Sequence, residues 1–587
     1  MLKVFNPLHP NIFSDTDMPE NSLTSQMNRK SADAGKAILE EFAKVTQTPG
    51  KASEALLMKI LFDNKDTEYG RKYHFADIHS IEEYQKTVPV ITYEAIEPSI
   101  ERMKAGEKNI LTAYPFRHMN LTSGTIGKKK SIPMTEPQAA VFMKYSNQYA
   151  FGLMAEYLDP EWMNARSFTP LEGNHETLPC GITLGCSSSI IAEAVKGGFE
   201  PYSSMLKALY TSPAEAMTPG PGINTRYMHI RFALMERDLN GISGGFMSNI
   251  VHLMTYLHDN YEMLINDIEK GTIDESVQMP ETTRKSLLAK IQPMPKRAAE
   301  LREVFKNGAD FCFMPEIWPK MQYIYAAGGD GFSVYADTLK EQFHGGKIHH
   351  IYSGVTASEG LWSVPAGIDD TTSVLVPDSA FMEFQPVEFG DDFSHLTTID
   401  NLEEGKIYEL VITNLCGFYR YRMGDAVKVT GFYNNTPAIE FMYRVNKTVN
   451  LVGEKTNEFM LRLTAKETAK ELGFSLFDYE IYPDTSAVPG KYIVMLETYD
   501  EKRFSISKEK LDRVVFEKLC QANDVYKECF GNNLIQAPDA YFEQPETQLL
   551  YRDKMIHLGA PSAQIKPVHI IGNEDEKNFF LIMRETG

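Results

Sequence analysis

The stretch NLTSGTIGKKKSIPMT, Asn120 to Thr135, combines small hydroxyl residues, two glycines and three consecutive lysines in one short segment. Its glycines allow the backbone to turn tightly and present bare N–H groups, and its hydroxyl side chains add further hydrogen-bond donors. The lysines add positive charge beside these donors. Together these groups predict a cradle for phosphate oxygens. The predicted cradle residues are Thr122, Ser123, Gly124, Thr125 and Gly127, with Lys130 at the rim.

This loop differs from a Walker A loop, which has four residues between its glycines and ends in GK[ST]. Here only two residues separate Gly124 from Gly127. Taken alone, the segment is equally typical of a polar surface loop with a solvated run of charge. A nucleotide site therefore needs support from other motifs.

Length and composition narrow the class of protein. A chain of 587 residues is too long for one hydrophobic core, so at least two domains are expected. The formal net charge of -20 disfavours general binding to nucleic acid or anionic membranes, because the chain repels phosphate at long range. The N-terminal segment does not resemble a signal peptide, and no segment is apolar for long enough to span a bilayer. These features predict a cytoplasmic protein.

Hydrophobic periodicity predicts two domains of unequal size. Apolar residues recur at helical spacing over 31–45 and over 248–271, where Gly271 ends the pattern. From Gly405 onward, β-rich runs are broken by Gly, Asn and Pro, as in an antiparallel sheet, and a helix-strand pattern follows over 461–499. These patterns predict a boundary near residue 445, with a large domain over residues 1–444 and a smaller α+β domain over residues 445–587.

Two further motifs carry groups suited to a nucleotide. Tyr421 to Asp425 (YRMGD) lies between two strand-like runs, where a carboxylate at a tight glycine turn can accept hydrogen bonds from two ribose hydroxyls. Thr356 to Glu359 (TASE) follows the strand-like HHIYSG, and its carboxylate can hold the Mg²⁺ that accompanies a nucleotide triphosphate. Singly, each motif is also typical of an ordinary turn. Together with the loop, in this order, they predict a site for ATP and Mg²⁺.

These motifs resemble those of the acyl-adenylate-forming enzymes, which include acyl-CoA ligases and firefly luciferase. Two other segments, 88–111 (VPVITYEAIEPSIERMKAGEKNIL) and 481–497 (IYPDTSAVPGKYIVMLE), resemble the GH3 family of acyl acid amido synthetases within that superfamily. The resemblance covers most of the chain. It implies the adenylate-forming enzyme fold, which is of the α/β class. In this fold a large N-terminal domain of β-sheets flanked by helices is followed by a small C-terminal α+β domain that rotates about a hinge.

The resemblance also implies roles for individual residues. TSGTIGKKK is similar to the phosphate loop of the superfamily, with Lys130 as its basic residue, and TASE is similar to the adenine and Mg²⁺ motif ending in Glu359. YRMGD is similar to the ribose motif, with Asp425 as the hydroxyl acceptor. The nucleotide-binding residues implied in these last two motifs are Thr356, Ala357, Ser358 and Asp425.

Two segments near the C-terminal domain complete the implied site. Residues 442–458 (MYRVNKTVNLVGEKTNE) are similar to the hinge and contain Arg444, while GAPSAQIKP is similar to a motif whose lysine, here Lys566, reaches the active site. The catalytic residues implied are Lys566, Glu359 and Arg444, with Glu359 as the metal ligand.

The chain departs from the family pattern at three positions. Ile126 replaces a common Ser or Thr, which removes one hydroxyl contact to phosphate, and Lys129 stands where an uncharged residue is common. Val355 replaces the Tyr of the plant members, so the ring that packs against adenine is missing. None of these changes removes a charge that the chemistry needs.

The function implied is ATP-dependent adenylation of a carboxylic acid through acyl-AMP, followed by transfer of the acyl group to an amine, by family analogy an amino acid. Aromatic residues and methionines around Tyr227 to Phe246 and at Trp318 favour a small apolar or aromatic acid, although the same residues also suit an ordinary core. A monomer is expected. The alternatives are an acyl-CoA ligase with the same adenylation step and a nucleotide-binding interaction protein without catalysis.

Overall fold

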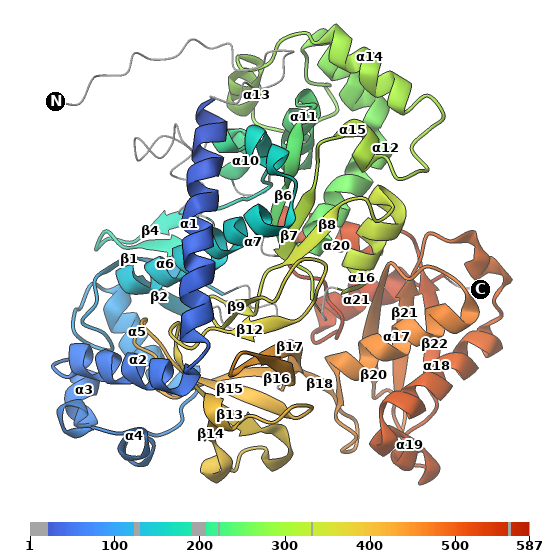
Figure 1. Ribbon diagram of the computed structural model, residues 1–587. Coiled ribbons are helices and arrows are strands. Elements are labelled where there is room, and N and C mark those ends of the chain that lie inside the picture. Colours follow the sequence, from blue (N-terminus) through green and yellow to red (C-terminus); the bar gives the residue numbers. More distant parts are fainter. Residues whose placement is uncertain are drawn as a thin grey trace, which may run out of the picture.

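The computed structural model describes residues 22–122, 130–186, 188, 207–220, 223–329, 333–445, 447–560 and 565–585. Figure 1 shows a large N-terminal domain, blue to yellow, with a smaller C-terminal domain, orange to red, packed against one side of it. The mixed α/β fold with a large and a small domain is therefore as predicted. None of the helices within these ranges is long and apolar enough to cross a membrane.

Helices cover the N-terminal part of the chain. The helix predicted over 31–45 is α1 (Leu23–Val45), which begins at the N-cap Ser22 and extends further toward the N-terminus than its apolar pattern suggested. Pro49 then begins the next helix, as expected for proline in a first helical turn. The helices that follow are α2 (Pro49–Asn64), α3 (Glu68–Lys72), α4 (Ile81–Thr87) and α5 (Tyr93–Lys104).

Helix α1 packs against α7 (Tyr149–Tyr157) at a close contact between Gly35 and Gly152. A Cβ atom built on Gly35 would lie 2.3 Å from the backbone nitrogen of Gly152. We expect Gly35→Ala to lower the free energy of unfolding by about 1–3 kcal/mol or more, because backbone atoms cannot move aside as a side chain can. Thermal unfolding measures this loss. The matched control is Gly531→Ala, where nothing lies within 4 Å of the added carbon, and a loss as large there would contradict the explanation.

A parallel sheet lies at the centre of the large domain, in the order β3 (Arg166–Phe168), β6 (Leu239–Phe246), β7 (Tyr323–Ala327) and β8 (His349–Tyr352). The long helix predicted over 248–271 is α12 (Met247–Lys270), and Gly271 ends it with a left-handed backbone, φ 66°. It shares the largest core with α11 (Arg226–Met235). The remaining helices of this region are α6 (Glu136–Phe142), α10 (Ala214–Met217), α13 (Glu281–Leu288), α14 (Pro295–Val304), α15 (Met314–Ile317) and α16 (Ser333–Thr338).

Two antiparallel arrangements position the motif residues. The first is the hairpin of β1 (Phe116–Leu121) and β2 (Ser131–Thr135), whose connection carries the predicted phosphate loop; β5 (Thr183–Gly185) and β4 (His175–Thr177) extend its sheet. The second is a seven-stranded sheet that includes the β-rich runs predicted after Gly405. Its order is β11 (Ser363–Pro365), β12 (Ser373–Leu375), β17 (Thr436–Arg444), β16 (Tyr421–Tyr433), β15 (Ile407–Thr413), β13 (Phe381–Pro386) and β14 (Thr397–Thr398).

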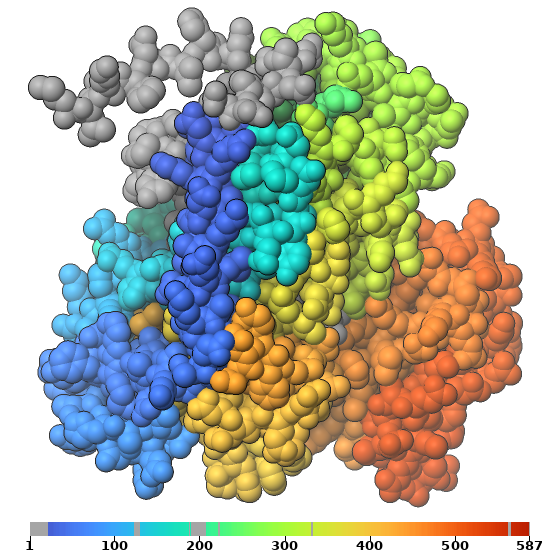
Figure 2. All heavy atoms as spheres, in the orientation of Figure 1, coloured from blue at the N-terminus to red at the C-terminus, as the bar shows by residue number. Residues whose placement is uncertain are grey.

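The C-terminal domain is built on the sheet β20 (Asp478–Asp484), β21 (Lys491–Glu497) and β22 (Asp539–Glu543). Helices α17 (Glu458–Leu472), α18 (Lys508–Ala522) and α19 (Asp524–Gly531) share a core with it, and α20 (Thr547–His557) and α21 (Glu574–Ile582) complete the domain. Two short hairpins lie before these elements in sequence: β9 (Thr356–Ala357) pairs with β10 (Gly360–Leu361) in the large domain, and β18 (Thr448–Val449) pairs with β19 (Thr456–Asn457) at the start of the C-terminal domain. Figure 2 shows the two domains in contact along a continuous boundary.

Candidate functional site

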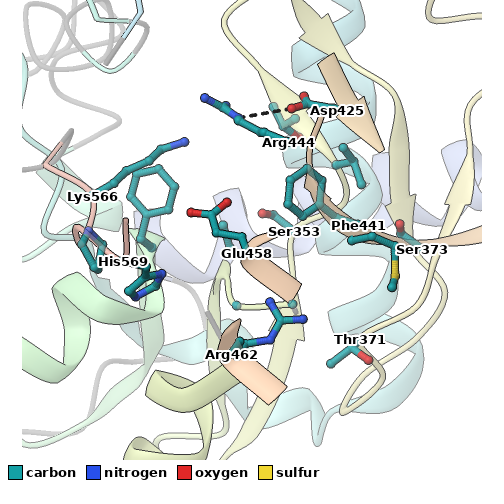
Figure 3. A pocket seen from close by; sticks show the side chains of 18 of the residues that line it. Ser353, Thr371, Ser373, Asp425, Phe441, Arg444, Glu458, Arg462, Lys566 and His569 are labelled. Atoms are coloured by element: carbon teal, nitrogen blue, oxygen red, sulfur yellow. Dashed lines mark ion pairs between the residues drawn. The ribbon is translucent and has the colours of Figure 1, made fainter. Parts of the chain in front are cut away.

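A pocket at the domain boundary receives residues from both domains. Thr356, Asp425 and Arg444 line it from the large domain. Lys566 and His569 line it from the C-terminal domain, together with Glu458 at the start of α17. Figure 3 shows Lys566, Glu458, Arg444 and Asp425 around one space, with the Lys566 chain reaching in from the opposite side to Asp425. Four residues predicted from four separate motifs therefore line a single pocket: Thr356, Asp425, Arg444 and Lys566.

Asp425 and Arg444 are cross-strand partners. The register of β16 against β17 places them directly opposite one another, and Arg444 Nε lies 3.3 Å from Asp425 Oδ1. The carboxylate is 7% exposed, whereas the arginine side chain is 47% exposed. The charge of Asp425 raises the pKa of Arg444, and burial opposes this shift only in part. The pair therefore presents a fixed carboxylate beside a permanent cation.

The YRMGD motif is not the predicted turn between two strands, because it lies within β16. Pairing with β15 passes from Ala426–Glu409 to Arg422–Val411, so three residues of β16 lie opposite one residue of β15. Gly424 permits this bulge with φ 78°, a left-handed conformation that glycine adopts without strain. A bulge bends the strand and turns a side chain without ending the ladder. It accounts for the position of Asp425 at the pocket.

Glu359 lies on the β9–β10 hairpin, close to this pair but not among the residues that line the pocket. Its side chain is buried, and burial raises the pKa of the carboxyl group. The charges of Lys130 and Arg444 act in the opposite direction. The neighbouring Ser358 accepts a hydrogen bond at its carbonyl from Asn120 Nδ2, 3.1 Å away, which ties the TASE hairpin to β1. Ala357 pairs with Gly360 within the hairpin.

Lys130 and Thr122 close the base of the predicted phosphate loop. Thr122 N donates to Lys130 O at 3.0 Å, and Lys130 N donates to Thr122 Oγ1 at 3.1 Å. Lys130 Nζ donates to Tyr421 Oη at 2.9 Å, so the lysine is directed to the first residue of YRMGD. Ser123, Gly124, Thr125 and Gly127, like Ile126 and Lys129, lie outside the described residues. Lys130 therefore contacts YRMGD, and Asn120, two residues before Thr122, contacts TASE.

Lys566 reaches the pocket over an aromatic ring. Its Nζ lies 5.2 Å from the centroid of Phe246, at the end of β6. Burial lowers the pKa of Lys566 to about 8, and the charge of Arg444 acts in the same direction, whereas Asp425 and Glu458 oppose the shift. An amine with this pKa loses its proton just above neutral pH, so its charge responds to the solution pH and to any anion brought beside it.

Several residues that line this pocket were not predicted from the sequence. Arg462 lies one helical turn after Glu458 on α17, so helical spacing from the hinge motif would have indicated it. Tyr479 and His569 stack with ring centroids 4.4 Å apart and also line the pocket, but 90 residues separate them and no local pattern relates them. Val355 does line the pocket, as its place in the motif suggested.

The predicted acid-pocket residues divide into two groups. Phe246 lines the pocket, together with Phe441 and Met442. Tyr227 and Trp318 belong instead to the largest hydrophobic core, and they are 3% and 0% exposed. Their polar atoms are satisfied there: Tyr227 Oη donates to Asp267 and Trp318 Nε1 donates to Ala233 O. The prediction for these two residues was wrong, because a core and an apolar pocket have the same composition.

The described residues do not supply a complete set of ligands for a metal ion. The described residues contain no group of three or more His, Cys, Asp and Glu side chains placed to hold an ion. His344 and His350 are hydrogen-bonded to each other through their Nε2 atoms, which lie 2.9 Å apart, and both side chains are buried. Glu359 is a single hard oxygen donor. It fits an ion such as Mg²⁺ that takes one or two carboxylates from the protein and its other ligands from phosphates and water.

Three family models match the chain: the GH3 family N-terminal domain over residues 38–348, the central domain over 373–444 and the C-terminal domain over 460–575. Among curated proteins, the chain is 29% identical to a probable indole-3-acetic acid-amido synthetase, GH3.11, of Oryza sativa subsp. japonica, over 84% of this chain and 87% of the relative. It is 26% identical to the jasmonoyl-L-amino acid synthetase JAR4 of Nicotiana attenuata, over 80% and 83%.

A solved structure supports the fold. That of the GH3.15 acyl acid amido synthetase superposes with a TM-score of 0.80 at 22% identity, and the match covers 94% of this chain and 97% of that one. The N-terminal family model alone spans more than half of the sequence. The chain belongs to the GH3 family.

Proposed function

We infer that this chain is an ATP-dependent ligase that converts a small carboxylic acid into an acyl adenylate and then transfers the acyl group to the amine of an amino acid, releasing AMP and pyrophosphate. The related proteins are named a probable indole-3-acetic acid-amido synthetase and a jasmonoyl-L-amino acid synthetase. The observation that carries the proposal is the meeting of Lys566 with Asp425 and Arg444 in one pocket between the domains.

The chemistry explains why such a pocket needs cations. A free carboxylate is a poor acyl donor because its leaving group would be oxide, and adenylation replaces that group with AMP. The attacking carboxylate and the triphosphate repel each other, and negative charge accumulates on the α-phosphate as the bond forms. Positive groups that are already in position stabilise that charge without reorganising. Lys566 and Arg444 are such groups in this pocket, and Lys130 is a third beside it.

Each motif then has a place in the proposed reaction. The Asp425 carboxylate accepts hydrogen bonds from the ribose hydroxyls, and Thr356 with its hairpin neighbours Ala357 and Ser358 borders the base. The loop from Thr122 to Lys130 binds the β- and γ-phosphates. Lys566 contacts the attacking carboxylate and the α-phosphate. These roles are those that the resemblance to the family implies, and the places of Thr356, Asp425 and Lys566 in the pocket support them.

Glu359 is the residue that would hold Mg²⁺. When bound, the ion supplies charge that neutralises the triphosphate and the departing pyrophosphate. The protein contributes one buried carboxylate, close to Lys130 and to the Asp425–Arg444 pair. This matches the usual division of ligands between protein and nucleotide for this ion.

The second step requires a different arrangement of the domains. The amine attacks the acyl carbon and AMP leaves, so the carboxylate that Lys566 contacts in the first step is already part of the acyl adenylate. We propose that the small domain rotates about the turn after β17, where Lys447 N donates to Arg444 O at 2.9 Å. Such rotation exchanges the groups presented to the bound adenylate. The expected hinge therefore coincides with the end of the strand that carries Arg444.

The pocket wall favours an apolar or aromatic acid. Phe246, Phe441, Met442 and Val355 supply apolar surface, and the polar groups gather around Asp425 and Lys566. A carboxylate with an apolar body would place its charged end beside the lysine. The monomeric state and the cytoplasmic location expected from the sequence stay predictions.

Asp425→Asn should raise the KM for ATP by about tenfold to a hundredfold while the KM for the acid changes little. The substitution removes the charge that strengthens the ribose hydrogen bonds and leaves Arg444 without its ionic partner. Steady-state kinetics with each substrate varied in turn measure the two constants. An equal rise of both constants, or a change only for the acid, would contradict the ribose assignment.

Product analysis tests the proposed reaction against its alternative. Purified protein is incubated with ATP, Mg²⁺ and an acid, with either an amino acid or coenzyme A, and mass spectrometry identifies the product. The proposal predicts an amide and AMP with the amino acid. A thioester formed with coenzyme A, and no amide, would assign the chain to the acyl-CoA ligases.

A further inference from the structure

Two neighbouring residues of the C-terminal domain enter the large domain beside the pocket. Phe477 is 2% exposed and belongs to the same hydrophobic core as α11 and α12. Asp478, which begins β20, is 1% exposed and follows it directly. An apolar ring and a carboxylate of the small domain are therefore both buried at the boundary. Any rotation of this domain has to withdraw them.

The two carboxylate oxygens of Asp478 have different partners. Tyr335 Oη, from α16 of the large domain, donates a hydrogen bond to Oδ2, and Tyr335 is itself 1% exposed. His569 Nε2, from the C-terminal domain, lies 3.1 Å from Oδ1. One carboxylate thus connects a residue of each domain. The contact to Tyr335 crosses the boundary, whereas the contact to His569 does not.

His569 lies three residues after Lys566 in the sequence, and several contacts hold it in place. Its carbonyl accepts a hydrogen bond from Ile481 N at 2.9 Å, and its ring stacks on Tyr479 of the same strand. Gln548 Nε2 donates to the carbonyl of Val568 at 3.2 Å, which holds the segment from the other side. The path from Asp478 to Lys566 therefore consists of the buried contact to His569 and the three residues of backbone that join His569 to Lys566.

Helix α16 has a second contact to the small domain. Lys466, on α17, lies 2.7 Å from Asp337 Oδ2 and donates to Ser333 Oγ at 3.0 Å. These contacts are more exposed than the one between Tyr335 and Asp478, with side-chain exposures of 33% for Lys466 and 57% for Asp337. Exposed ion pairs contribute little to stability. The buried hydroxyl–carboxylate bond is thus the stronger attachment of α16.

We propose that Tyr335 and Asp478 form a latch between the domains that holds Lys566 in the pocket for adenylation, and that the latch opens when the small domain rotates for acyl transfer. The proposal rests on the proposed function and adds positioning residues to it. Rotation breaks the bond to Tyr335 and keeps the bond to His569, because only the first joins the two domains. Neither residue needs to touch the substrate to control the adenylation step.

Tyr335→Phe tests the latch, because it removes one hydroxyl and keeps the ring. We expect the rate of acid-dependent pyrophosphate exchange to fall about tenfold, which is the effect expected from the loss of one hydrogen bond to a charged group. Transfer from presynthesised acyl-AMP to the amino acid should stay within about twofold of the wild type, or become faster. The matched control is Tyr145→Phe, which removes another buried hydroxyl bonded to a carboxylate, at 2.6 Å from Asp378, with both residues in the large domain. The control should leave both steps unchanged.

An equal loss of both steps in Tyr335→Phe, or no loss in either, would overturn the latch. Amide hydrogen exchange without substrates separates this failure from a failure of the proposed function. The latch predicts faster exchange in Tyr335→Phe over α16 and over residues 478–484, and unchanged exchange there in Tyr145→Phe. If the wild type adenylates no acid, the proposed function fails, and unchanged hydrogen exchange in Tyr335→Phe would refute the latch independently.

Discussion

Replacing Lys566 by alanine should lower the rate of acyl-AMP formation by about a hundredfold or more, while acyl transfer from presynthesised acyl-AMP persists. The side chain reaches the pocket from the small domain, so its ammonium group moves when that domain rotates. Removal of a charge that stabilises the transition state has an effect of this size. Exchange of labelled pyrophosphate into ATP measures the first step, and amide formation from added acyl-AMP measures the second.

The control for this variant is Lys510→Ala, which removes an exposed lysine from α18 of the same domain and should change neither step. The pH dependence gives a further check. Because the pKa of Lys566 is about 8, its charge is present below that pH and is lost above it. Adenylation by the wild type should therefore decline above about pH 8, and Lys566→Arg should not show this decline, because arginine stays protonated. Loss of both half-reactions in Lys566→Ala would refute the assignment.

Replacing Glu359 by glutamine should raise the Mg²⁺ concentration needed for half-maximal pyrophosphate exchange and lower the maximal rate of exchange. The ratio of this rate to this concentration should fall by about a hundredfold. The substitution keeps the size of a buried side chain and removes its charge, so the ion loses its protein carboxylate. Charge stabilisation by a bound metal contributes several kcal/mol to reactions of this kind. Titration with Mg²⁺ at saturating ATP and acid separates the two effects.

Burial of Glu359 supplies an internal check on this second prediction. Burial raises the pKa of its carboxyl group, so a proton competes with the ion as the pH falls. The Mg²⁺ requirement of the wild type should rise toward acidic pH, and that of Glu359→Gln should stay constant. An unchanged Mg²⁺ requirement in Glu359→Gln would place the metal ligand elsewhere.

Patterns within a short segment predicted local structure well. The apolar stripe over 248–271 predicted α12 and its glycine end, because a single face of a helix repeats at a fixed spacing. The β-rich runs after Gly405 likewise predicted β15, β16 and β17. YRMGD was misplaced because glycine with a positive φ suits a turn and a bulge equally. The choice between them depends on whether the neighbouring strand continues to pair, and β15 does.

Only the site residues that lie in recognisable sequence motifs could be predicted. Thr356, Asp425, Arg444 and Lys566 meet as expected, although the chain distance from Thr356 to Lys566 is over two hundred residues. Trp318 was assigned to a pocket because burial, not sequence, distinguishes a core aromatic from a pocket wall. Tyr335 and Asp478 were not indicated at all. Their hydrogen bond depends on how two domains pack, and neither residue lies in a recognisable pattern.

The central claim is that this pocket activates a carboxylic acid with ATP, and pyrophosphate exchange tests it most directly. Labelled pyrophosphate is incubated with the full-length protein, ATP and Mg²⁺, with neither amine nor coenzyme A, across aryl, indolyl, cyclopentanone and fatty carboxylates. The account predicts that at least one acid drives label into ATP, and that Lys566→Ala abolishes the exchange. Binding of ATP without exchange for every acid would contradict the account and favour a nucleotide-binding protein that performs no adenylation.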